Sequence, residues 1–233
     1  MHAPTSPAND PAALLASAPH RPLFLAGTVA VLLTMAWWTL ELASLRFGWG
    51  RWPQPSIPPV FGHAVLIQYG LFPLFMFGFL MTTFPRWMNG PQVPPRRYLP
   101  VAGGVLGGYV LGTLGLLGQP LLLKLGLLLV LAGYVVGVAT LAGVLRAAAD
   151  RNRHGWSCLA ALCVGTLGLA SFLAWLLVPG VSPEVAWLAV KLGTFGFLLP
   201  VYFTVCHRML PFFSKNMVAG YEMWRPAWNL PVE

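Results

Sequence analysis

Three histidines stand at or near the ends of long apolar segments, and their side chains are suited to metal binding: His20, His63 and His207. Imidazole nitrogen is a ligand for haem iron, copper and zinc. His20 and His207 are each followed by an arginine, Arg21 and Arg208, and a guanidinium group can hold a haem propionate by paired hydrogen bonds. These residue types predict cofactor binding at His20, Arg21, His207 and Arg208, with His63 and His207 as candidate metal ligands.

Two alternatives stay open for these residues. A histidine at a membrane surface also bonds backbone carbonyl groups or lipid headgroups, which is a structural role. Cys206, His207 and Met209 resemble a soft copper set in their residue types. Neighbouring positions on one helix point about 100° apart, however, so these three side chains cannot all reach one ion.

The composition of the chain indicates which elements must position these residues. Of its 233 residues, 57% are apolar and only 9% are charged. A soluble domain has roughly a quarter of its residues charged. The composition therefore excludes a soluble enzyme and a disordered chain. It also excludes a nucleic-acid-binding protein, although the net charge is +8. About 20 apolar residues cross the hydrocarbon of a bilayer. Six segments meet that length: Leu23–Leu45, Pro59–Phe84, Leu99–Gly118, Leu121–Arg146, Trp156–Val178 and Glu184–Phe213.

The basic residues predict the orientation of these spans, because cytoplasmic loops carry an excess of Lys and Arg. One side of the membrane collects Arg21, Arg86, Arg96, Arg97, Arg146, Arg151, Arg153, Arg208, Lys215 and Arg225. The other side has Arg46, Arg51 and Lys124. We therefore predict an all-α, polytopic transmembrane helical bundle of six spans with both termini cytoplasmic, whose positive charge attracts anionic membrane lipid.

This topology limits which histidines can share a ligand. His20 begins the first span and His207 lies near the end of the sixth, so both belong at the cytoplasmic end. A haem bound by both requires α-carbons roughly 10–15 Å apart. His63 begins the second span at the opposite end, about 30 Å away, and would serve a separate site. Around the transmembrane domain, residues 20–215, the sequence predicts a disordered cytoplasmic lead, residues 1–19, and a cytoplasmic tail, residues 216–233.

Small residues predict how the spans associate. Gly104, Gly108 and Gly112 recur every four residues, and Gly133 and Gly137 repeat this spacing on the next span. Helices in lipid associate by close backbone approach at such residues. We expect this stripe to pack against another helix of the same chain; the alternative is a homodimer contact.

Three strings carry a resemblance to a known family: HRPLFLAG at residues 20–27, GFLMTTFPRWMNGP at 78–91 and HRMLPFF at 207–213. In order and spacing they resemble the NnrS family of bacterial inner-membrane proteins. That family typically shows a start like F-R-P-F-F-L, a G-F-L-L-T-A-x-P-N-W-T-G stretch and an R-M-L-P-F-F run. The strings extend over almost the whole chain.

The resemblance implies haem and copper as cofactors and a role in tolerance of nitric oxide during denitrification. It also implies a multi-pass location in the bacterial cytoplasmic (inner) membrane. No catalytic cycle can be carried over from the family, so no catalytic residue is assigned.

Two departures from the family pattern affect these expectations. Family members usually have about twelve spans, so six spans resemble the N-terminal half. The family also commonly carries H-A-H-E-M before the G-F-L stretch. His63 occupies the first histidine position there, whereas Val65 and Leu66 replace the second histidine and the glutamate. The haem expectation is therefore better preserved than the copper expectation.

Three functions compete. The first is a haem-binding, NnrS-like membrane protein in nitric oxide or redox stress. The second is a non-catalytic accessory subunit that packs beside a membrane-protein partner in a larger respiratory complex. The third is a small transporter, which is favoured only by Glu41 and Lys191 within the spans.

Overall fold

The computed structural model describes residues 10–48, 56–148, 153–218 and 220–222, and each regular element among them is a helix. Within these ranges, six helical segments are long and apolar enough to cross a membrane. This confirms the predicted all-α bundle of six spans and identifies a multi-pass membrane protein. The orientation of the termini stays a prediction.

The six spans follow one another along the chain. Span 1 is α2 (His20–Phe47), and span 2 consists of α3 (Pro59–Val65), η2 (Leu66–Leu71) and α4 (Phe72–Trp87). Spans 3, 4 and 5 are α5 (Pro95–Leu116), α6 (Pro120–Ala147) and α7 (Arg153–Leu177). Span 6 consists of α8 (Pro183–Lys191), η3 (Leu192–Leu198) and α9 (Leu199–Met217).

Prolines set where several spans begin. Pro59, Pro95, Pro120 and Pro183 each stand at the first helical position, where the missing N–H is not needed and the fixed φ suits a helix. The third span therefore starts at Pro95, four residues before the predicted Leu99. Hydropathy defines only the apolar part of a span, whereas the helix continues into the polar flanks.

The predicted cytoplasmic lead, residues 1–19, is described by the structure from Asp10 onward. Residues 10–19 include a short helix, α1 (Pro11–Leu15), whose first turn is capped by Asp10. Tyr98 donates a hydrogen bond to the Ala16 carbonyl, and Arg21 donates one of 2.7 Å to the Leu14 carbonyl. These bonds tie the segment to α5 and α2. Residues 1–9 of the predicted lead and residues 223–233 of the predicted tail lie outside the described residues.

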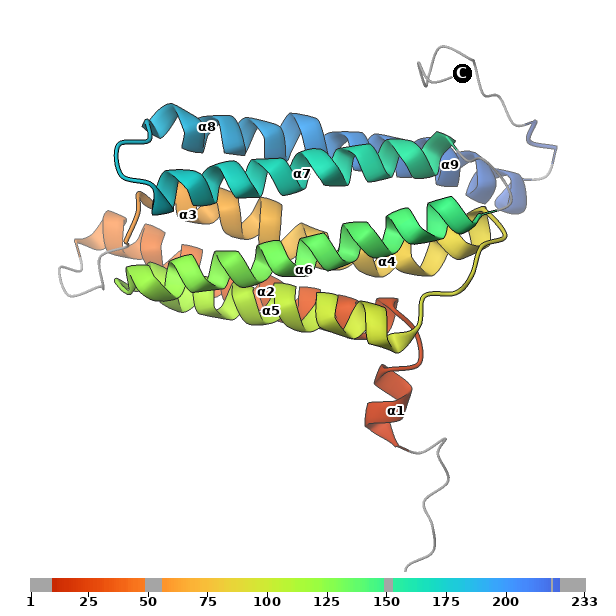
Figure 1. The fold of residues 1–233 in the computed structure, drawn as a ribbon, viewed down its shortest axis with the longest axis horizontal. Helices are drawn as coiled ribbons and strands as arrows, with labels where there is room; N and C mark the ends of the chain where they lie inside the picture. The colour runs from red at the N-terminus through yellow and green to blue at the C-terminus, as the bar shows by residue number, and fades with distance from the viewer. Residues whose placement is uncertain (1–9, 49–55, 149–152, 219, 223–233) are drawn as a thin grey trace, which may run out of the picture.

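Span 2 occupies the centre of the bundle (Figure 1) and is the most buried of the six. It contacts spans 1, 3, 4 and 6, while α7 lies between α6 and span 6. At one end of the bundle α2, α5 and α7 begin and α4, α6 and α9 end (Figure 1). We call this the basic end, because it holds the larger set of basic residues predicted to lie together.

Two spans widen into π-helix near their middle, at η2 and η3. Each widened segment is followed by a proline at the second position of the next α-helix, Pro73 and Pro200. A proline has no N–H and clashes with the carbonyl four residues earlier, so a regular ladder cannot continue there. The N–H of Phe72 and that of Leu199 instead bond the carbonyl five residues back.

The hairpin of α5 and α6 closes through backbone contact. A Cβ atom on Gly108 would overlap the Gly126 carbonyl and lie 2.7 Å from the Val130 nitrogen. A Cβ on Gly126 would overlap the backbone of Gly112, and one on Gly104 would lie 3.2 Å from the Gly133 α-carbon. The predicted glycine stripe therefore packs within the chain, as expected.

Candidate functional site at the basic end

His207 forms a pair with a histidine that the sequence analysis missed, His154. The two rings stack with centroids 5.3 Å apart, and His154 Nε2 lies 3.1 Å from His207 Nδ1. One nitrogen donates and the other accepts. When His207 Nδ1 donates, its Nε2 carries a free lone pair, the form a metal ligand needs, and His154 fixes the ring orientation. The sequence did contain an indication of this pair: His154 lies at the start of span 5, which the topology places at the same level as the end of span 6.

His20 contacts a different helix. Its Nδ1 lies 3.3 Å from the Thr82 hydroxyl of α4, which itself donates a hydrogen bond of 2.8 Å to the Gly78 carbonyl. Because Thr82 uses its proton on Gly78, its oxygen accepts from His20 Nδ1–H. The Nε2 atom of His20 then carries the lone pair. His20 also lines a small cavity of about 190 Å³ between the start of α2 and the end of α4.

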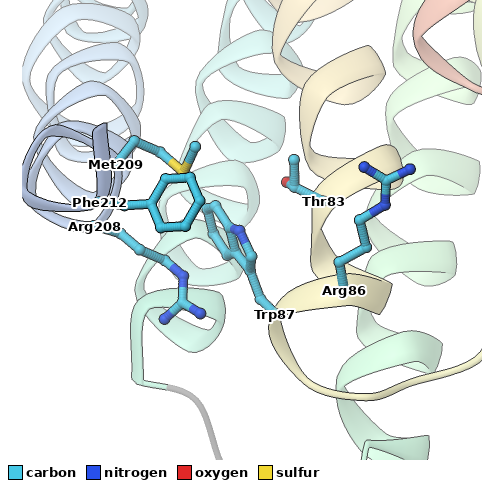
Figure 2. Close-up of a pocket in the computed structure, with 6 residues that line it drawn as sticks. All are labelled: Thr83, Arg86, Trp87, Arg208, Met209 and Phe212. Carbon is cyan, nitrogen blue, oxygen red and sulfur yellow. The ribbon is translucent and has the colours of Figure 1, made fainter. Parts of the chain in front are cut away.

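A larger cavity of about 420 Å³ lies between α4 and α9 (Figure 2). Its lining combines cationic, aromatic and thioether side chains: Thr83, Arg86 and Trp87 from α4, and Arg208, Met209 and Phe212 from α9. The guanidinium of Arg208 lies 4.7 Å from the centre of the Trp87 ring. The volume falls within the range of about 300–1,000 Å³ typical of small-molecule sites.

Arg86 connects the two cavities, because it lines both. Sequence reasoning did not select Arg86, although it lies within the second resemblance string. Arg21, which it did select, bonds the Leu14 carbonyl of α1. The arginines that line the larger cavity are therefore Arg86 and Arg208. The shared site of His20 and His207 stays a prediction: one ring bonds Thr82 and the other bonds His154.

His63 lies at the opposite end of span 2, as predicted from the topology. Its ring stacks on Trp38 of α2 with centroids 4.0 Å apart. Its Nδ1 atom is buried and has no hydrogen-bond partner among the described residues. In the part of the chain that the structure describes, no three His, Cys, Asp or Glu side chains gather closely enough to hold one metal ion.

A polar cluster joins the two widened segments at mid-span. Gln68 of η2 donates a hydrogen bond of 2.7 Å to Thr194 of η3, and Tyr69 donates one of 2.6 Å to the Ala189 carbonyl. Within the described residues, Gln68 Oε1 and the hydroxyl of the fully buried Tyr134 have no partner. We refer to Gln68, Tyr69, Tyr134 and Thr194 as the mid-span cluster. It holds spans 2 and 6 together by side-chain bonds.

Comparison with known proteins agrees with the resemblance seen in the sequence strings. A family model described as NnrS protein matches residues 14–232. Comparisons with curated proteins and with solved structures found no match. The matched range includes His20, His154 and His207 and both arginines of the larger cavity. The chain therefore belongs to the NnrS family.

Proposed function

We propose that this membrane protein binds haem at the basic end and acts in tolerance of nitric oxide or redox stress. The observation that carries the proposal is the cavity between α4 and α9, which combines Arg86 and Arg208 with aromatic walls. His207 immediately precedes Arg208, and its Nδ1 is engaged by His154. His207 is next to Arg208 on α9 but is not itself among the residues that line the cavity. Together these residues offer the group types that haem requires: an imidazole for the iron, apolar side chains for the ring and cations for two carboxylates.

Each residue has a definite task in this proposal. His207 would supply Nε2 to the iron, and His154 would hold that imidazole in the required tautomer through its hydrogen bond to Nδ1. Arg86 and Arg208 would hold the propionates, and Trp87 and Phe212 would cover the macrocycle. Bound haem would supply an iron centre that can take a diatomic ligand where a coordination position is left open. His20, whose Nε2 carries a lone pair, is the candidate for a second protein ligand, which would occupy that position instead.

Copper does not fit equally well. A copper site needs several soft or imidazole ligands around one ion. His63 has Trp38 against its ring, and the described residues form no group of three ligands. The proposal therefore rests on haem, and copper binding at His63 or His207 stays a prediction.

The test is the visible absorption spectrum of protein purified in detergent after expression in cells supplied with haem precursors. We expect a Soret band in the parent chain and little or none in His207→Ala. His63→Ala is the matched control, because it removes a histidine from the opposite end, and it should keep the band. A His154→Ala change should weaken haem binding by about tenfold, as loss of an orienting partner does.

The second ligand is decided by His20→Ala. If this variant keeps haem but the spectrum of its ferrous form changes from low-spin to high-spin, His20 is the second protein ligand of the haem. If its spectrum is unchanged, His207 binds without it. A parent chain that shows no Soret band, even after incubation with haem, would contradict the proposal. Survival of cells under a nitric oxide donor, with the parent chain or His207→Ala, tests the physiological role.

The alternative function is an accessory subunit, and span 6 is the observation that favours it. Span 6 is the least buried of the six spans, with large aromatic side chains on its surface: Trp187, Phe195, Tyr202, Phe203, Phe212 and Phe213. Such a face suits a membrane-protein partner or a second copy of the chain. Absence of haem together with co-purification of one stoichiometric membrane protein would favour this function.

The transporter hypothesis gains no specific observation. Lys191 is exposed on α8, as expected for a side chain that extends along the helix toward the interface, whereas Glu41 is buried in α2. We infer a location in the bacterial cytoplasmic membrane with the basic end facing the cytoplasm. Reporter fusions after Pro53 and after Gln92 should report opposite sides, and finding them on one side would refute this orientation.

A further inference from the structure

A third cavity lies at the basic end, between the start of α5 and the last turns of α6. Its volume is about 360 Å³. The loop before α5 and the first turn of α5 form one wall, and α6 forms the other. Arg86, Arg208 and the histidines of the candidate haem site do not line it. It shares Gln92 and Val93 with the small cavity at His20, but its cations and its α6 wall are its own.

The mouth of this cavity is cationic. Arg96 and Arg97 both line it, and both side chains are exposed at the start of α5. They stand at the level where span 3 emerges from its apolar segment, which is the level of lipid headgroups. Two adjacent guanidinium groups at that depth attract a phosphate group.

The floor of the cavity is an apolar furrow on α6. Ala139, Gly143 and Val144 lie on one face of that helix, between about one and two turns from its end at Ala147. A Cβ atom on Gly143 would meet nothing within 4 Å, so the helix surface has a notch there. Thr140, the polar residue of this face, uses its hydroxyl on the Val136 carbonyl. The Thr140 proton is therefore not available to a ligand, and the furrow is mainly apolar.

We propose that this cavity binds an anionic phospholipid. Arg96 and Arg97 hold the phosphate at the mouth, and the first part of an acyl chain lies in the furrow over Gly143. Charge and shape both support this occupant, because the cations lie at the headgroup level and the apolar notch lies below them toward the hydrocarbon. The described residues that line the cavity include no aromatic ring and no histidine to serve a haem. The ammonium group of a zwitterionic lipid would be repelled by the two arginines.

The experiment is native mass spectrometry of the full chain in detergent, titrated with phosphatidylglycerol or phosphatidylcholine. We expect the parent chain to bind one phosphatidylglycerol in preference to phosphatidylcholine. The double variant Arg96→Gln/Arg97→Gln should bind phosphatidylglycerol about tenfold more weakly. The matched control is Arg153→Gln/Lys215→Gln, which removes two exposed cations of the basic end outside this cavity and should leave that affinity unchanged.

A second variant separates shape from charge. Gly143→Leu fills the notch with a side chain that has open space around its Cβ, so the fold is retained. It should reduce phosphatidylglycerol binding while leaving both arginines in place. Glycerol phosphate without acyl chains should compete poorly. Any one of three results would overturn the proposal. These are an equal loss of affinity in both double variants, unchanged binding in Gly143→Leu, and equal binding of the two lipids by the parent chain. Haem content, which depends on other residues, should stay unchanged in all three variants.

Discussion

Two pairs of spans are held together in opposite ways. One pair is spans 3 and 4, and the other is spans 2 and 6. The α5–α6 pair closes backbone to backbone, with Gly108 against the Gly126 carbonyl and Gly115 against Leu123. Spans 2 and 6 touch at mid-span through the Gln68–Thr194 hydrogen bond and then end apart at the basic end. A cavity of about 420 Å³ separates their last turns.

The difference explains where a ligand can bind. A glycine contact leaves no space between two helices, so the α5–α6 pair is a rigid wall with sites only at its edge. The α4–α9 pair carries Trp87, Arg208 and Phe212 at the corresponding level, and these bulky side chains keep the helix ends apart. We therefore expect stability to be concentrated in the closed pair and the proposed haem binding in the open one.

The largest expected effect comes from breaking the closed pair with Gly126→Leu. A side chain there would overlap backbone atoms of Gly108 and Gly112, which cannot move aside without separating the helices. Overpacking costs about 1–3 kcal/mol or more, and the loss of close approach adds to it. We expect a large drop in the thermal unfolding temperature in detergent and low yield of folded protein.

Gly103→Leu is the control for that variant. It places the same side chain on α5, at a position where a Cβ atom meets nothing within 4 Å. Its unfolding temperature should stay close to that of the parent chain. A similar loss in both variants would show that glycine content, rather than helix contact, limits stability.

Most of this architecture could be predicted from the sequence, and the exceptions have physical causes. Hydropathy located the six spans because lipid requires long apolar helices, and the four-residue spacing of Gly104, Gly108 and Gly112 indicated the closed pair. The widened segments were missed, although Pro73 and Pro200 at mid-span were their signal. A proline shows that the ladder breaks, but not that the helix continues in a wider form.

The candidate site was predictable only in part. His20 and His207 were placed at one end by topology, because a span has a fixed length. Their partners, Thr82 and His154, were not foreseen, since pairing depends on the rotation of each helix about its axis. The same reason applies to Arg86: its position within the second string does not show that its side chain lines the cavity.

An intermediate effect is expected when the wall of the open pair is removed by Trp87→Ala. Trp87 packs against Phe84, with ring centroids 5.7 Å apart, and lies under the Arg208 guanidinium. Because its ring is only partly buried, we expect a loss of about 1–3 kcal/mol in stability, which is less than for Gly126→Leu. Trp87→Phe should recover most of that loss. Chemical unfolding in detergent measures both, and an effect larger than that of Gly126→Leu would reverse the ranking of the two pairs.

A smaller effect is expected at the mid-span cluster, where polar side chains join spans 2 and 6. Comparison of Gln68→Leu, Thr194→Val and the double variant isolates the bond between them, which is 2.7 Å long. Hydrogen bonds between transmembrane helices contribute about 0.6 kcal/mol on average, with a maximum near 1.7. The coupling energy from the double-mutant cycle should fall in that range. A value near zero would mean that ring packing around Phe197 holds the two spans together.

The double variant Arg86→Gln/Arg208→Gln should have the smallest effect on stability. It is also the sharpest test of the difference between the closed and the open helix pair. Both side chains line the open cavity; Arg86 is exposed, whereas Arg208 is half-buried and lies over the Trp87 ring. Replacing them by a polar residue of similar length removes little from folding beyond that cation–π contact, which contributes about 0.5–1 kcal/mol. We therefore expect an unfolding temperature close to that of the parent chain, but a strongly reduced Soret band, because the propionates lose their partners. Arg153→Gln with Lys215→Gln is the control with the same loss of charge. If the arginine pair of the cavity mattered to stability and not to haem, the open pair of helices would be a structural contact rather than a binding site.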